Sequence, residues 1–362
     1  MDKHFKSNWL LYILFTFIVS RLIMYYQFHV ADLLLLHGKT SFTDVMCKWD
    51  CKWYLTIIND GYDNVVRTTP RIWKGLANWA FFPLYPAIVG LIKFILPFNP
   101  VVIGVILNQI FVLLSSVVFY KILRLEFDDL NSRFGVTILL FTPFSIYFSS
   151  LYTEALFLFL SVSGFYFIKS HKLVQASIIG GLLSATRPVG IMFLIPLFIA
   201  LLRNKLRFRK IIFLSLIASS GLLLFMVYLQ YKTGDFLAFQ HIQKGWGRRG
   251  WDTHNISGQL IKMIQDYHNS SIFILSFLIS IYLFTKKYYE EAFFNLSCIL
   301  PGVLTGTMMS EGRFSGTLFT LYFAIVIFAK DSWFLKVLAF LIIFVTYLSY
   351  YIYWIGHSTF LI

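Results

Sequence analysis

Residues 101–123, VVIGVILNQIFVLLSSVVFYKIL, form an apolar run of 23 residues with one charged side chain, Lys121. A helix needs about 20 consecutive apolar residues to cross the hydrocarbon core of a bilayer, so this run predicts a membrane-spanning helix. Residues 211–229 and 335–353 form similar runs without an acidic side chain. The sequence therefore predicts an all-α, polytopic membrane protein.

The composition agrees with this class. Hydrophobic residues make up 58% of the 362 positions, charged residues make up 13%, and the mean hydropathy is +0.72, unlike a soluble domain. The first apolar run, 9–28, is followed by no small-residue cleavage site and is expected to remain as the first helix. No repeat or soluble head region interrupts the pattern, which predicts one transmembrane domain over 1–362.

The net charge of +14 is distributed as in a membrane protein rather than a nucleic-acid-binding protein. Basic side chains in short hydrophilic gaps are typical of cytoplasmic loops, where they also face anionic lipid. We therefore expect no nucleic-acid partner. The clusters are Lys3 and Lys6; Lys121, Arg124 and Arg133; Lys169 and Lys172; residues 203–210; Lys286 and Lys287; and Lys330 and Lys336.

An alternating topology follows from these loops. With the N-terminus inside, 9–28 crosses outward, 29–100 forms a first extracytoplasmic loop with juxtamembrane helices, and 101–123 returns. Residues 83–96 reach only about 20 Å as a helix, which favours an interfacial or re-entrant segment. About eleven spans and an outer C-terminus result. The spans 173–186 and 189–202 are short enough to require broken or tilted helices. The other remaining predicted spans are 134–150, 151–168, 211–231, 271–285, 292–309, 314–329 and 333–354.

This topology places six polar motifs on the extracytoplasmic side, one of which is the second large loop, 232–270. Acidic, arginine and aromatic side chains that converge on one membrane boundary are typical of an active site supplied from the bilayer. The motifs are 48–54 (KWDCKWY), 81–86 (FFPLYP), 150–154 (SLYTE), 186–188 (TRP), the loop 232–270 itself, and 310–313 (SEGR).

The same motifs carry a family resemblance. Residues 49–55, WDCKWYL, followed by Gly61-Tyr62, resemble the W-D-x-x-[WH]-[YF] loop of the phosphatidylinositol-glycan mannosyltransferase class V family (GPI mannosyltransferase 2) and its bacterial relatives. The chain departs from the family after Arg313, where Phe314-Ser315-Gly316 lacks the usual proline. Further similarities, in order, are 81–86 (FFPLYP), 152–157 (YTEALF), 185–190 (ATRPVG), 234–239 (GDFLAF) with 246–248 (WGR), and 309–314 (MSEGRF).

The resemblance implies a GT-C glycosyltransferase fold and transfer of a sugar from a polyprenyl-phosphate donor to a lipid or glycan acceptor. In the eukaryotic members the donor is dolichyl-phosphate mannose, so the implied activity is that of a mannosyltransferase. The implied location is a bacterial inner membrane, or the ER membrane in a eukaryote, with an extracytoplasmic active site.

Inverting transfer to a hydroxyl needs a carboxylate to accept the acceptor's proton. Asp50 is the candidate general base; alternatively, its side chain only caps a juxtamembrane helix. Trp49, Trp53 and Tyr54 are candidates for stacking on sugar, although aromatic residues also collect at membrane interfaces without further function.

Positive charge must stabilise the leaving phosphate. Arg187 and Arg313 are the candidates, because guanidinium groups bind phosphate in a planar, permanently charged geometry; alternatively, they pair with Glu154 or Glu311 or extend to the interface. Glu154 itself is a candidate for orienting substrate, with a structural salt bridge as the alternative. The predicted substrate-binding set is completed by Tyr85, by Glu311, and by Arg248 in a basic-aromatic rim with Lys244, Trp246, Arg249 and Trp251.

No resident cofactor or metal is predicted. Three cysteines are too few for a disulfide framework, and Cys47 and Cys51 lie four apart, as on one helical face, without the ligands that would complete a zinc site. The histidines at 241, 254 and 268 do not cluster in a ligand-like pattern. Asp50 with a second acid has the chemistry to bind a divalent ion, although no spacing demands one.

Two alternatives remain open. A lipid-linked glycan flippase or another secondary transporter also contains charged residues and broken helices, but near the bilayer centre and with inverted repeats. A non-enzymatic assembly subunit would tolerate loss of Asp50.

Overall fold

The computed structural model describes residues 8–38, 40–69, 74–250, 252 and 254–356. These residues form helices connected by turns and loops, with no strand among them. The prediction of an all-α membrane protein is confirmed at this level. Within the described ranges, the helices long and apolar enough to cross a membrane are α1 (Asn8–Ala31), α5 (Pro100–Leu123), α10 (Phe208–Thr233), α13 (Tyr267–Thr285) and α17 (Trp333–Ile355).

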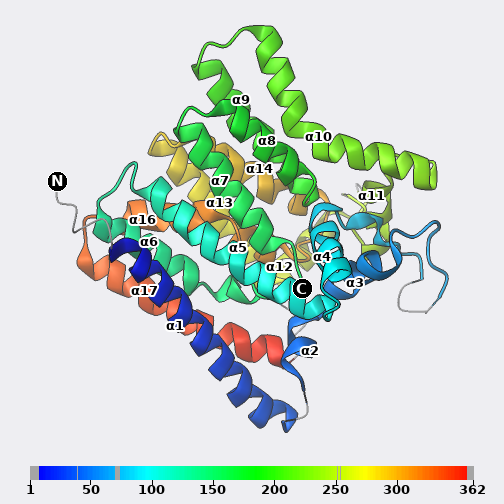
Figure 1. The fold of residues 1–362 in the computed structure, drawn as a ribbon, viewed down its shortest axis with the longest axis horizontal. Coiled ribbons are helices and arrows are strands. Elements are labelled where there is room, and N and C mark those ends of the chain that lie inside the picture. The colour runs from blue at the N-terminus through cyan, green and yellow to red at the C-terminus, as the bar shows by residue number, and fades with distance from the viewer. Residues whose placement is uncertain (1–7, 39, 70–73, 251, 253, 357–362) are drawn as a thin grey trace.

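Shorter helices complete the bundle. Helix α5 packs against α7, α7 against α8, α8 against α10, and α13 against α14, so the helices form a layered bundle between the long outer ones (Figure 1). The shorter helices are α4 (Leu84–Ile95), α6 (Asp129–Leu140), α7 (Glu154–Lys169), α8 (Leu173–Ser184), α9 (Leu194–Arg203), α14 (Tyr289–Leu304) and α16 (Phe319–Ala329).

Small elements lie beside the ends of these helices. In Figure 1, α3 and α11 are on the right and α2 is below the label of the C-terminus. Most connect the long helices to the loops that carry the polar motifs. They are η2 (Asp32–Leu36), α2 (Phe42–Met46), α3 (Cys51–Asp60), η4 (Asn78–Ala80), η5 (Pro143–Ile146), η6 (Pro188–Phe193), α11 (Ala238–His241), η7 (Ile242–Trp246), α12 (Ile256–Gln265) and α15 (Glu311–Gly316).

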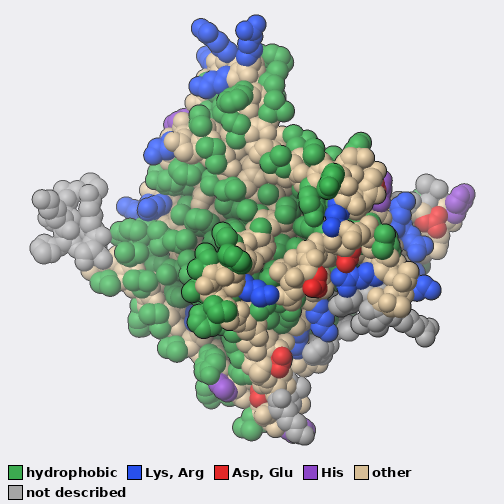
Figure 2. Space-filling model, turned by 45° about the vertical axis from the view of Figure 1, so that its right-hand side comes forward, with side chains coloured by type: hydrophobic (Ala, Val, Ile, Leu, Met, Phe, Trp, Pro, Cys, Tyr) green, Lys and Arg blue, Asp and Glu red, His purple; other side chains and the backbone are tan. Residues whose placement is uncertain are grey.

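The outer surface is apolar along the helices. Phe15 and Leu22 on α1, Leu224 on α10 and Ile342 on α17 are all more than half exposed, as expected for side chains that face lipid. Figure 2 shows hydrophobic side chains over the left and centre of the view, with lysine and arginine gathered at the top, at the turn between α9 and α10, and again on the right together with acidic side chains.

Helix α6 differs from the predicted span 134–150. It ends at Leu140, the 3₁₀ turn η5 follows, and turns continue to Thr153. Pro143 explains the difference, because proline lacks an amide hydrogen and excludes the helical conformation from the residue before it. Arg21 of α1 donates a hydrogen bond to the Leu140 carbonyl (3.1 Å) and so caps the interrupted helix.

Other predicted boundaries are also revised. The expected break within 173–202 is present, as the 3₁₀ segment η6 between α8 and α9. The expected spans 292–309 and 314–329 are shortened to α14 and α16, with α15 lying between them. The predicted basic pair Lys3 and Lys6 lies outside the described residues, as does Trp251.

Two clusters of charged side chains lie at opposite ends of α7. At its C-terminal end, Lys169 Nζ contacts Glu126 Oε1 (2.6 Å) and Glu291 Oε1 (2.7 Å), which joins the end of α7 to the turn after α5 and to the first turn of α14. At its N-terminal end, Glu154 faces the polar motifs. Sixteen helical residues separate the two ends by about 24 Å, close to the thickness of a bilayer core.

Candidate functional site

A cavity of about 1160 Å³ lies beside the N-terminal end of α7. Its walls come from the loop before α3, the start of α7, the α8–η6 junction, the last turn of α14 and the segment around α15. The structure thus brings together motifs that are widely separated in the sequence. The predicted site residues that border the cavity are Trp49, Asp50, Trp53, Tyr54, Glu154, Arg187, Arg248 and Arg313.

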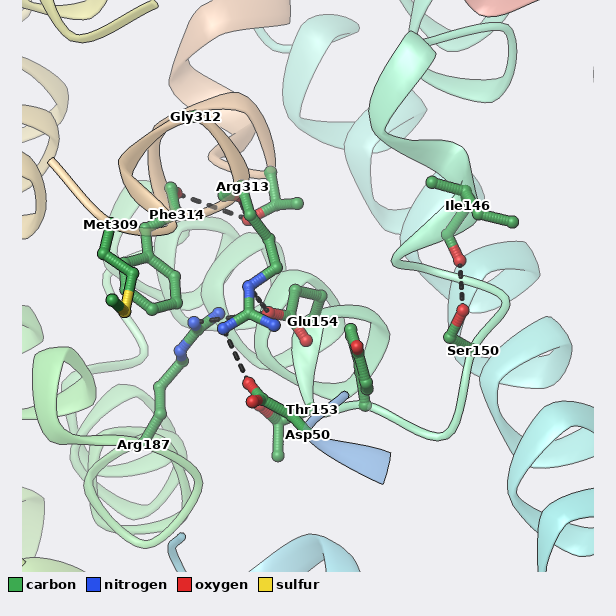
Figure 3. Close-up of polar contacts among 12 residues, drawn as sticks. Asp50, Ile146, Ser150, Thr153, Glu154, Arg187, Met309, Gly312, Arg313 and Phe314 are labelled. Atoms are coloured by element: carbon green, nitrogen blue, oxygen red, sulfur yellow. Dashed lines mark hydrogen bonds and ion pairs between the residues drawn. The ribbon is translucent and has the colours of Figure 1, made fainter. Parts of the chain in front are cut away.

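Four of these side chains form a continuous chain of ion pairs. Arg313 Nη2 lies 2.8 Å from Asp50 Oδ2, and Arg313 Nε lies 3.3 Å from Glu154 Oε1. Arg187 Nη2 reaches the same Glu154 oxygen at 3.3 Å. Figure 3 shows Arg313 extending from α15 toward both acids while Arg187 approaches from the opposite side.

Asp50 stands at the N-cap position of α3, yet its side chain makes no capping hydrogen bond. Its carboxylate turns to Arg313 instead and remains 27% exposed to the cavity. The preceding residue, Trp49, has a left-handed backbone (φ +42°), a conformation that an aromatic residue adopts only when its surroundings enforce it. The loop therefore directs the Asp50 carboxylate to the cavity rather than to the helix end.

Glu154 opens α7 and is almost completely buried, with 2% of its side chain exposed. A carboxylate in the first turn of a helix interacts favourably with the positive end of the helix dipole. The position of Arg187 has a local cause too: it precedes Pro188 and is extended (φ −165°, ψ 159°), as a residue before proline prefers. Arg187 is therefore extended between the end of α8 and the start of η6, beside Glu154.

Phe314 lies at the centre of three arginines. The guanidinium carbons of Arg187, Arg313 and Arg248 stand 4.7, 4.9 and 5.5 Å from its ring centroid, within range of cation–π attraction. Arg248 also donates to the Met309 carbonyl (3.1 Å). Burial, and then the neighbouring charge of Arg313, lower the pKa of Arg248.

The cavity carries an excess of positive charge. Five basic side chains border it, against the three acids Asp44, Asp50 and Glu154. Like charges held together in a partly desolvated cavity repel each other strongly, so an anion placed among the arginines lowers the energy of the site. The basic side chains are Lys48, Lys52, Arg187, Arg248 and Arg313.

Aromatic side chains line a second region of the cavity wall. The ring of Trp53 is stacked on Phe81 (5.9 Å between centroids) and meets Trp246 edge-on (5.5 Å). Tyr54 lies edge-on to Phe81 (5.2 Å), and its hydroxyl reaches Thr153 Oγ1 (3.4 Å). Rings of this kind offer a flat apolar surface with polar edges.

Two predicted substrate-binding residues are not at the cavity surface. Tyr85 is fully buried and donates to the Gly104 carbonyl (3.2 Å), so it fixes α4 on α5. Glu311 is also fully buried and accepts a hydrogen bond from Ser315 Oγ (2.6 Å). Direct substrate contact by these two side chains is therefore not supported. Of the predicted basic rim, Lys244 and Arg249 are exposed and outside the cavity lining.

The cysteines differ from the sequence expectation. Cys47 and Cys51 form a disulfide; Cys47 precedes the turn and Cys51 opens α3, so a spacing of four does not mark one helical face here. No group of three or more His, Cys, Asp or Glu with metal-ligand geometry occurs among the described residues. Asp50 and Glu154 both pair with arginine, which leaves no pair of adjacent free carboxylates in this cluster.

Sequence reasoning did not single out three side chains at the site. Phe314 and Tyr152 both face the guanidinium of Arg313, the latter at 5.1 Å, and both lie within the quoted motifs. Lys48 donates to the carbonyls of Trp354 (2.6 Å) and Ile355, a contact that no local pattern signals.

Comparison with models of known protein families and with curated protein sequences finds no match.

Proposed function

We propose that this protein is a membrane glycosyltransferase, with the activity of a mannosyltransferase, that moves a sugar from a polyprenyl-phosphate donor to a hydroxyl of a lipid or glycan acceptor. One observation carries the proposal: a carboxylate, Asp50, lies beside a cluster of three arginines in a single cavity at one end of a membrane bundle. Inverting sugar transfer from a phosphate needs both kinds of group in one cavity, the base on the acceptor side of the anomeric carbon and the positive charge on the side of the leaving phosphate.

The roles follow from the geometry. Arg187, Arg248 and Arg313 surround one ring and supply the positive charge that an anionic leaving phosphate requires. Asp50 accepts the proton of the acceptor hydroxyl as that oxygen attacks the anomeric carbon from the face opposite the phosphate, whose bond to the sugar breaks. Glu154, which is buried between Arg187 and Arg313, positions both guanidinium groups.

The aromatic wall supports a sugar or lipid acceptor. Trp53, Trp246 and Phe81 form one apolar surface in the cavity that also holds Asp50. The volume of about 1160 Å³ exceeds that of a typical pocket for one small ligand, as a site for a donor and an acceptor requires.

We also propose eleven crossings, a GT-C architecture and an extracytoplasmic site, in a bacterial inner membrane or the ER membrane. The crossings are α1, α5, α6, α7, α8, α9, α10, α13, α14, α16 and α17. The basic loop 203–210 and the Lys169 cluster mark the cytoplasmic end. The acids and arginines of the site lie at the opposite end of α7, not midway along it, which favours an enzyme over a flippase or another secondary transporter.

The test is sugar transfer by the purified protein from polyprenyl-phosphate mannose to a panel of lipid and glycan acceptors. We expect a mannosylated product with inverted anomeric configuration. The same preparation, reconstituted in vesicles, is assayed for movement of a fluorescent lipid-linked glycan between leaflets. Movement without transfer to any acceptor would overturn the glycosyltransferase proposal in favour of a flippase.

A further inference from the structure

The Cys47–Cys51 disulfide encloses the loop that carries the candidate base. Between the two cysteines lie Lys48, Trp49 and Asp50, so the bond closes a five-residue ring around the segment. Asp50 is the last residue of that ring before Cys51, the first residue of α3.

The ring is anchored on both sides by the rest of the fold. Lys48 Nζ donates to the Trp354 carbonyl at the end of α17, and the Lys48 carbonyl accepts a hydrogen bond from the hydroxyl of Tyr152 (2.9 Å). The indole of Trp354 donates in turn to the Val45 carbonyl (2.8 Å). Opening the disulfide removes the cross-link between Cys47 and the first residue of α3, so that the backbone and these non-covalent contacts alone hold the loop.

The ring also contains a residue with a left-handed backbone, Trp49. A non-glycine residue stays in this conformation only when its surroundings over-determine it. Trp49 has φ +42°, and Asp50, directly after it, points to Arg313 at 2.8 Å. A five-residue ring restricts the backbone conformation on both sides of Trp49 and Asp50. An open chain lacks this restriction.

We propose that the Cys47–Cys51 disulfide positions Asp50 against Arg313, and that the site is active only when this bond is formed. The inference rests on the proposed function for the role of Asp50, but the position of the carboxylate is independent of it. The two cysteines are positioning residues, since neither sulfur is assigned a part in sugar transfer.

The bond is open to thiol chemistry from the cavity. Cys47 is half-buried and borders the cavity, whereas Cys51 is fully buried. A dithiol attacks the Cys47 sulfur as a thiolate, and Cys51 leaves as a thiolate that takes up a proton. The second thiol of the reagent then displaces Cys47, so the protein gains two thiols while the reagent is oxidised to a disulfide. A disulfide oxidant reverses both steps.

This dependence matches the proposed side of the membrane. Disulfides persist in oxidising compartments and are reduced in the cytosol, so a site that requires this bond operates on the extracytoplasmic side. Newly made protein would acquire activity only after the loop is exposed to an oxidising environment.

The experiment uses the full chain carrying Cys298→Ala, so that thiol labelling reports only the pair. Dithiothreitol is titrated into the folded, detergent-solubilised protein, and alkylation followed by mass spectrometry gives the fraction of open disulfide. We expect kcat for sugar transfer to fall at least about tenfold as the bond opens, with the donor KM unchanged within about threefold because the arginines lie on other elements. Reoxidation by glutathione disulfide should restore kcat.

An unchanged kcat in the opened protein, or unbridged cysteines in the unreduced protein, would overturn the inference. A second measurement does not depend on enzymatic activity. The change in melting temperature caused by Asp50→Asn is measured in two backgrounds, the oxidised protein and the Cys47→Ser/Cys51→Ser protein, and the two changes are compared. A disulfide that positions Asp50 against Arg313 predicts a change at least halved without the bond, whereas equal changes contradict it. If oxidised protein transfers no sugar, the proposed function fails, and this thermal cycle still decides the positioning role.

Discussion

The carboxylate of Glu311 occupies the space that a side chain at position 302 would fill. A Cβ placed on Gly302 of α14 would lie 1.8 Å from Glu311 Oε2, and Glu311 is completely buried. Gly302 itself borders the cavity. Because glycine has no side chain, it leaves a notch in α14, and the buried Glu311 carboxylate packs into this notch at the cavity wall.

Gly302→Ala is therefore expected to lower the melting temperature, although alanine is normally the better residue within a helix by about 1 kcal/mol. The physical reason is steric, because the methyl group and the Glu311 carboxylate compete for one space. In a Glu311→Ala background the same substitution should be neutral or stabilising. Thermal unfolding of the four proteins in detergent checks this, and an equal loss in both backgrounds would show that the notch is not the cause.

The stability of the protein should fall as pH rises toward neutrality. Burial raises the pKa of Glu311 to about 7 from 4.5, despite the opposing hydrogen bond from Ser315 and the charges of Arg248 and Arg187. An acid with a raised folded-state pKa contributes stability below its unfolded pKa and loses it as pH rises through the folded value. The melting temperature should thus decline as pH rises from about 4.5 to about 7 and change little above that.

Glu311→Gln isolates this group, because glutamine keeps the shape of the side chain and does not ionise. We expect a flatter dependence of melting temperature on pH in this variant than in the wild type. Two parallel pH profiles would assign the slope to other groups.

Asp50→Asn should reduce kcat for sugar transfer at least about 100-fold, because the amide accepts no proton in the transition state. Gel filtration and circular dichroism check that the fold is retained. Asp60→Asn is the matched control, since Asp60 lies on the same helix but is exposed at its far end. Equal activity in the Asp50→Asn and Asp60→Asn proteins would move the base elsewhere, with Glu154 the next candidate.

Arg248→Gln should weaken binding of the donor phosphate and raise the donor KM about tenfold, as expected for one charge-assisted contact. The neighbouring Arg249→Gln is the control, because that side chain is exposed and outside the cavity lining. Initial rates over a range of donor concentration separate KM from kcat. A donor KM that responds equally to both substitutions would indicate general surface charge instead of a phosphate site.

Glu154→Gln should destabilise the protein by about 3 kcal/mol and lower transfer, because two buried guanidinium groups lose their shared charge partner. Glu126→Gln provides a comparison at the other end of α7, where Glu291 still pairs with Lys169. Chemical denaturation in detergent gives both stabilities. A smaller loss for Glu154→Gln than for Glu126→Gln would contradict the central place assigned to Glu154.

Much of the fold could be predicted from the sequence. The run 101–123 predicts α5 to within one residue, because a helix that crosses lipid must be long, apolar and internally hydrogen-bonded. The break at Pro143 was not expected, since the surrounding residues are apolar enough for a continuous span. Proline governs the backbone locally even where hydropathy favours a helix.

The residue types of the candidate site were predictable, and the alternative in which Arg187 and Arg313 pair with Glu154 is present in the structure. The pairing of Arg313 with Asp50 was not predicted. Asp50, Glu154, Arg187 and Arg313 stand out in the sequence as polar residues beside helix breaks, and all of them border the cavity. Tyr85 stands out equally well, yet it is a packing residue. A motif shows which side chains are near a helix end, but not which face of that helix the neighbouring helices cover.

The amino-acid sequence by itself thus determined the class of protein and the approximate helix boundaries, because hydropathy, charge and proline act locally along the chain. Only the tertiary structure decided that Arg313 bridges Asp50 and Glu154, that Glu311 lies behind the wall, and that Cys47 and Cys51 close a ring. These relationships depend on how separate helices pack and on which side chains then come into contact. The spacing of residues along the chain does not determine that packing.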